Sequence, residues 1–79
     1  MTEFDNLRRS YSLAIQMGLA AGCSYEDCKI ANEFIHKFCE NYIDNSSNDS
    51  NEKRAMKLEL KALKETLSKE IESSFQHEK

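Results

Sequence analysis

The apolar positions of this chain follow helical spacing in three separate stretches. The most apolar stretch is residues 25–43, whose apolar side chains fall within about 180° of a helix surface. A helix that rests on one neighbour needs an apolar stripe of only about 100°. We therefore predict that residues 25–44 form a central helix that at least two other helices cover. Its apolar side comprises Cys28, Ala31, Phe34, Ile35, Phe38, Cys39, Tyr42 and Ile43, and its polar side carries Glu26, Asp27, Lys29, Glu33, His36, Lys37 and Glu40.

The first stretch, residues 2–21, predicts a helix with two apolar sides. Thr2 followed by Asp5 matches a capping box, and Gly22 is placed to end the helix as a left-handed residue. The larger apolar side comprises Phe4, Leu7, Tyr11, Ala14, Ile15 and Gly18, and a smaller stripe on nearly the opposite side comprises Leu13, Met17 and Ala20. This smaller stripe has two interpretations, scattered surface residues or a contact surface for another chain, and the sequence leaves both open.

The connection between the first two helices is only two or three residues long. Ser24, with Asp27 three residues later, is placed to cap the second helix. Cys23 and Cys28 then occupy the two positions that meet in a hydrophobic staple. So short a connection predicts that residues 2–21 and 25–44 form an antiparallel helical hairpin.

Residues 44–51 read DNSSNDSN and predict a long, flexible polar loop before the third helix. Asp49, with Glu52 three residues later, is the best start for that helix, which we expect to span residues 50–75. Its apolar stripe is narrow and comprises Met56, Leu60, Leu63, Leu67 and Ile71, with Leu58 and Phe75 off the stripe. We expect it to pack lengthwise on the central helix or on a symmetry mate, and residues 77–79 to fray.

A chain of 79 residues predicts one small domain, here all-α, with three helices. Domains near this size bury only about 60% of their unfolded surface, so oligomerisation is a common aid to their stability. We therefore expect a homodimer or larger homo-oligomer. The three cysteines, and the absence of a signal peptide or a bilayer-length apolar run in this sequence, lead us to expect a cytoplasmic protein that does not enter a membrane.

Four potential zinc ligands lie within 17 residues, Cys23, Cys28, His36 and Cys39. If residues 25–43 form one continuous helix, Cys28 and Cys39 lie roughly 16 Å apart along its axis, too far to share an ion. Glu33 and His36 have the spacing of a di-iron ligand pair, but di-iron sites need two such pairs and further carboxylates. We therefore predict no metal site and no cofactor, and we interpret the cysteines as small apolar residues.

Two other arrangements suggest chemistry or nucleic-acid binding. Cys23 and Cys28 lie near enough for a redox pair, yet they lack the Cys-x-x-Cys spacing of redox enzymes. A helix, a glycine turn and a capped helix also describe a helix-turn-helix, but Glu26 and Asp27 would face the phosphates. With a net charge of −3, we regard nucleic-acid binding as disfavoured.

No nucleophile–base pair or phosphate-cradling loop is evident, so we predict a non-enzyme. The preferred hypothesis is a protein-interaction module, such as a regulator, an inhibitor or a chaperone-like adaptor, that acts through helix faces. The predicted contact residues are Leu13, Met17 and Ala20, with Tyr11 and Tyr42 as aromatic anchors where they are incompletely buried. The alternatives are an anionic-ligand site at an oligomer interface, near Arg8 and Arg9, and the DNA-binding regulator.

Overall fold

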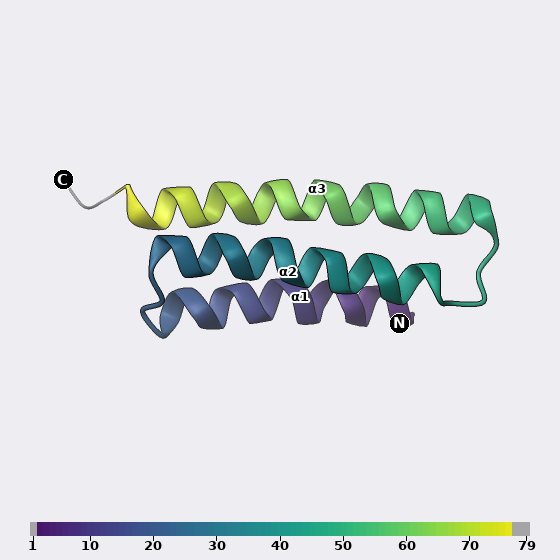
Figure 1. Ribbon diagram of the computed structural model, residues 1–79, viewed down its shortest axis with the longest axis horizontal. Coiled ribbons are helices and arrows are strands. Elements are labelled where there is room, and N and C mark those ends of the chain that lie inside the picture. The colour runs from purple at the N-terminus through teal and green to yellow at the C-terminus, as the bar shows by residue number, and fades with distance from the viewer. Residues whose placement is uncertain (1, 77–79) are drawn as a thin grey trace.

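The computed structural model describes residues 2–76, which form three helices and no strand. Helix α1 spans Glu3–Ala20, α2 spans Tyr25–Asp44 and α3 spans Ser50–Phe75. Figure 1 shows the three helices lying lengthwise beside one another, with the two connections at opposite ends of an elongated molecule. Each helix contacts both of the others. With three helices and no strand among residues 2–76, the fold is all-α, as predicted.

The helices begin at the capping residues that the sequence indicates. Thr2 and Asp5 exchange both hydrogen bonds of a capping box at the start of α1, and Asp49 and Glu52 do the same at the start of α3. The Ser24 hydroxyl accepts a hydrogen bond from the Asp27 N–H at the start of α2. These bonds satisfy backbone N–H groups that have no partner inside the helix.

The first helix ends in a Schellman motif, with Gly22 in the left-handed region at φ +86°. The Cys23 N–H donates to the Gly18 carbonyl at 3.1 Å, and the Gly22 N–H donates to the Leu19 carbonyl at 3.2 Å. These two bonds satisfy carbonyls of the last turn and reverse the chain within four residues. The predicted role of Gly22 is confirmed.

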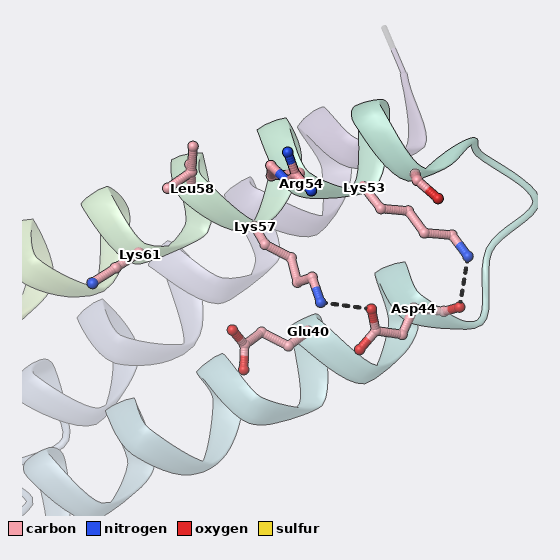
Figure 2. A pocket seen from close by; sticks show the side chains of 8 residues that line it. Glu40, Asp44, Lys53, Arg54, Lys57, Leu58 and Lys61 are labelled. Carbon is pink, nitrogen blue, oxygen red and sulfur yellow. Dashed lines mark hydrogen bonds and ion pairs between the residues drawn. The ribbon is translucent and has the colours of Figure 1, made fainter.

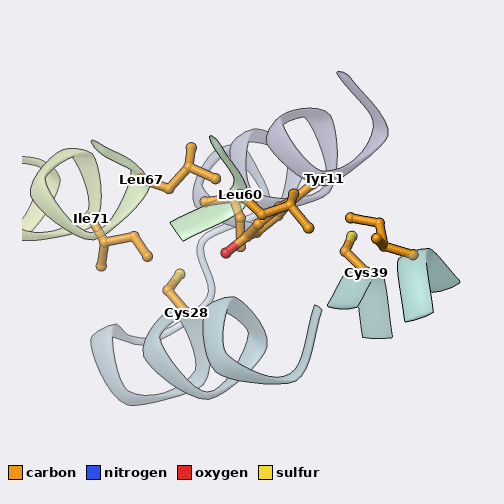
Figure 3. Close-up of a cluster of buried hydrophobic side chains, with 8 residues drawn as sticks. Tyr11, Cys28, Cys39, Leu60, Leu67 and Ile71 are labelled. Carbon is orange, nitrogen blue, oxygen red and sulfur yellow. The ribbon is translucent and has the colours of Figure 1, made fainter. Parts of the chain in front are cut away.

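The core lies along the line where the three helices meet (Figure 3). Each helix contributes to it, and its apolar members are Tyr11 and Ile15 from α1, Cys28, Cys39 and Ile43 from α2, and Leu60, Leu67 and Ile71 from α3. The α3 stripe therefore packs on the other two helices of the same chain. Because only eight apolar residues among residues 2–76 are buried, this core is small.

The predicted orientation of the central helix is wrong on one side. Phe34, Phe38 and Tyr42 were expected to be covered, but all three are exposed. Asn32 and His36 are buried instead, although His36 was expected on the solvated side. Helix α3 packs over the side of α2 that carries Asn32, and no other helix of the described chain covers the three aromatic residues.

Three further predictions need correction. Ala14, expected on the covered side of the first helix, is exposed because α3 packs on a different side of α1. The loop is shorter than expected, residues 45–49, and Asn48 hydrogen-bonds to Ser46 within it. Phe75 was expected off the stripe, but it packs edge-on against Tyr25 with ring centroids 5.6 Å apart. The prediction that residues 77–79 fray lies outside the described residues.

The two glycines give a matched test of this end of α1. Gly22→Ala should lower the free energy of unfolding by about 1–2 kcal/mol, because a side chain disfavours the left-handed conformation. Gly18→Ala should raise it by up to about 1 kcal/mol, because a Cβ at this helical position would meet only Cys23 Sγ, at an ordinary 3.9 Å. Urea unfolding followed by circular dichroism, at one fixed protein concentration, measures both. Changes of the same sign would contradict this description.

Candidate protein-interaction surface

Asn32 is a buried polar residue that joins all three helices. The Tyr11 hydroxyl of α1 donates to the Asn32 side-chain oxygen, and it also lies 3.2 Å from the Asn32 backbone carbonyl. The Asn32 amide group donates to α3, to Ser68 Oγ at 3.0 Å and to the Lys64 carbonyl at 3.2 Å. A buried amide is tolerated only when its hydrogen bonds are made, so this contact favours one register of the three helices.

Charged residues on the two sides of α3 match the two helices that it contacts. The side toward α2 is basic, and Lys57 pairs with Asp44 at 2.8 Å while Lys64 pairs with Glu33 at 3.0 Å (Figure 2 shows the first pair). The side toward α1 carries acids, and Glu59 pairs with Arg8 at 2.9 Å. Exposed ion pairs contribute little stability, but they oppose the alternative orientations of α3, because like charges would then meet.

These contacts hold α3 on one side of α1 and α2 and leave the other side bare. The bare side carries large apolar side chains that are each between 46% and 71% exposed. Together they form the outer apolar face, which we define as Leu13 and Met17 of α1 with Ile30, Phe34, Phe38 and Tyr42 of α2. Monomeric proteins seldom expose an apolar surface of this size unless it has a binding role.

The outer apolar face has four residues on α2 and two on α1. Residues four apart point in similar directions on a helix, so Ile30, Phe34, Phe38 and Tyr42 follow a continuous stripe along α2. The Tyr42 hydroxyl lies 3.5 Å from Glu3 of α1, which places the end of this stripe beside α1. Leu13 and Met17 lie on α1 away from Arg8, whose side chain reaches α3.

The predicted contact residues divide into two groups. Leu13, Met17 and Tyr42 belong to the outer apolar face, and Ala20 is exposed near the end of α1. Tyr11 is only 1% exposed, so it is a core residue and is not accessible as a surface anchor. The sequence therefore identified the α1 part of this surface and only Tyr42 of its α2 part.

Ile30, Phe34 and Phe38 are the members of the outer apolar face that the sequence interpretation missed. Phe34 and Phe38 were assigned to the core because they continue the apolar side of α2. The spacing of four between successive residues from Ile30 to Tyr42 was the available signal, since each step advances about 40° around the helix and so leaves Ile30 and Phe34 far from the side of Cys28 and Cys39. An apolar side of about 180° thus contains two stripes, one buried and one exposed.

The cysteines and His36 are placed as parts of the scaffold. Cys28 and Cys39 are buried on one continuous helix, and burial raises the pKa of both thiols, which disfavours the reactive thiolate. Cys23 is exposed, and all three thiols are free. His36 Nε2 is buried without a hydrogen-bond partner among residues 2–76, with Glu40 Oε2 at 3.9 Å. No metal-binding group of three or more His, Cys, Asp or Glu residues occurs in that range.

Of the two arginines considered for an anion site, Arg9 is exposed, whereas Arg8 is paired within the chain. Arg8 contacts Asp5 and Glu59, and it lies over the Phe4 ring at 5.3 Å. Figure 2 shows the most basic groove, where Lys53 donates to the Asp44 carbonyl at 2.9 Å and Lys57 to its carboxylate. The acidic residues at this groove reduce its attraction for phosphate.

Comparison with known protein families, with curated proteins and with solved structures found no match to this chain. Among residues 2–76, none of the helices combines the length and the apolar character needed to cross a bilayer.

The buried amide gives a stability prediction. Asn32→Ala should lower the free energy of unfolding by about 1–3 kcal/mol, because the Tyr11 hydroxyl and Ser68 lose their buried partner. The matched control is Asn41→Ala, an exposed position on the same helix, which should change it by less than about 0.5 kcal/mol. Urea unfolding measures both variants. Equal effects of the two substitutions would show that Asn32 does not join the helices.

Tyr11 gives a prediction about alkaline pH. Burial raises its pKa above the ordinary value of 10.0, and the charges of Cys39 and Glu33 act in the same direction. Above pH 10 the unfolded chain therefore loses this proton before the folded chain does, so the free energy of unfolding should fall as the pH rises. Tyr11→Phe should reduce that slope, whereas Tyr42→Phe should keep it because Tyr11 is retained. An unchanged slope in Tyr11→Phe would contradict the burial of this hydroxyl.

Proposed function

We propose that this chain is a small non-enzymatic protein-interaction module that binds through the outer apolar face. In this proposal an antiparallel hairpin of α1 and α2 presents the binding surface, and α3 supports the hairpin from the other side. A regulator, an inhibitor or a chaperone-like adaptor would each fit such a surface. The cytoplasmic location also stays a prediction.

The observation that carries the proposal is the exposure of Phe34 and Phe38 on a regular helix. Phe34 is 71% exposed and Phe38 is 60% exposed, whereas small residues such as Cys28 and Cys39 fill the core. Aromatic side chains are enriched at protein interfaces, where they supply large contact area for a small loss of side-chain entropy. Two exposed phenylalanines one helical turn apart therefore favour a partner that covers them.

The arrangement gives less support to the alternatives. An anionic ligand near Arg8 would have to compete with Asp5 and Glu59, which already contact its guanidinium group. A DNA duplex would meet the exposed carboxylates of Glu26 and Asp27 at the start of α2. The apolar surface, by contrast, needs no rearrangement of charged side chains before a partner binds.

Site-specific photocrosslinking in cells tests this proposal. A benzophenone side chain in place of Phe38 should form a discrete covalent adduct with a protein, because the side chain sits in the proposed contact. The matched control is the same group in place of Leu58, which is also exposed, at 63%, but lies on α3. Mass spectrometry identifies each adduct, and Phe34→Glu should remove the adduct formed at position 38.

The opposite pattern would refute the proposal. Adducts at position 58 but none at position 38 would place the contact on α3. Adducts at neither position, with normal expression and helix content, would exclude a stable protein partner for this surface.

A further inference from the structure

We infer that the occupant of the outer apolar face is a second copy of this chain, bound through the same face around a two-fold axis. This inference rests on the proposed function, because it names the partner of the same surface. Two independent features carry it: the area of the outer apolar face and the absence of charged residues on the part of α1 beside it.

The area of the outer apolar face suits a stable dimer. Phe34, Phe38 and Tyr42 together expose on the order of 350 Å², because one aromatic side chain presents about 150–250 Å². Leu13, Met17 and Ile30 bring the face to roughly 600 Å². A standard interface buries about 800 Å² of each partner, including a polar rim. A second copy of the same face therefore supplies a matching area, with the flanking alanines and polar residues as the rim.

The charges on α1 allow the face to meet its own copy. A two-fold interface places each patch against itself, so a patch with charges of one sign would repel its partner. The α1 sequence from Ser10 to Ala21 contains no charged residue. The central part of the α1 surface can therefore contact a second copy without burying an unpaired charge.

The spacing of the α2 stripe fits the same symmetry. Ile30 and Tyr42 are the ends of the stripe, and the midpoint between them is residue 36. Residue 36 is also the midpoint between Phe34 and Phe38. In an antiparallel pairing centred at this level, Phe34 of each copy meets Phe38 of the other while Ile30 meets Tyr42. One axis position thus pairs all four apolar residues of the stripe.

The resulting assembly would place two α1–α2 pairs against each other and both α3 helices outside. The four inner helices then enclose the outer apolar faces as a second core, comparable to that of a four-helix bundle. This second core would offset the small number of fully buried residues in each chain. The α3 helices keep their contacts with α1 and α2 unchanged, so formation of the dimer needs no refolding.

Analytical ultracentrifugation of the purified full chain tests the inference. The wild-type chain should sediment with twice the 9.1 kDa mass of one chain. Phe34→Glu should weaken the dimer at least about tenfold, because a charge would be buried at the centre of the interface. Leu58→Glu adds the same charge at an exposed leucine of α3 and should keep the wild-type dimer. Circular dichroism checks that each variant keeps its helices.

A wild-type chain that stays monomeric at all measured concentrations would overturn the inference, and so would a dimer that Leu58→Glu disrupts and Phe34→Glu does not. If the chain is monomeric while position 38 still crosslinks to a different protein, the dimer fails and the proposed function stands. If position 38 forms no adduct in cells and the chain is monomeric, both fail.

Discussion

The position of α3 depends on the hydrogen bonds of one buried amide. Asn32 accepts a hydrogen bond from Tyr11 of α1 and donates to Ser68 and to the Lys64 carbonyl of α3. A buried amide that loses these partners costs about 1–3 kcal/mol, a large fraction of the stability of a domain this small. The ion pairs of Glu33 and Asp44 with lysines of α3 favour the same placement. Together they fix which side of α2 is covered.

The exposed face follows from that constraint. The apolar residues of α2 extend over about half of its surface, but α3 occupies only the side that carries Asn32. Phe34 and Phe38 are left outside although both are large apolar residues. A polar contact that sets the register of a fold thereby also sets the surface that is available for association. In this chain of 79 residues, α2 therefore contributes both to the core and to the outer apolar face.

Local features of the fold were predictable from the sequence, because each depends on a few neighbouring residues. Thr2, Ser24 and Asp49 cap their helices as expected, and Gly22 adopts the left-handed conformation that ends α1. The rotation of α2 was not predictable from periodicity, because burial of Asn32 depends on hydrogen bonds from residues 21 and 36 positions away. For the same reason, Leu13 and Met17 were identified as surface residues while Phe34 and Phe38 were assigned to the core.

We propose that the side of α1 and α2 away from α3 is an interface between two copies of this chain. Nuclear Overhauser effects measured on a mixture of isotope-labelled and unlabelled chains test it most directly, since they report only contacts between different copies. We expect intermolecular signals from the rings of Phe34 and Phe38 to side chains of the outer apolar face. Intermolecular signals that map instead to α3, or the absence of any such signal at millimolar concentration, would contradict it.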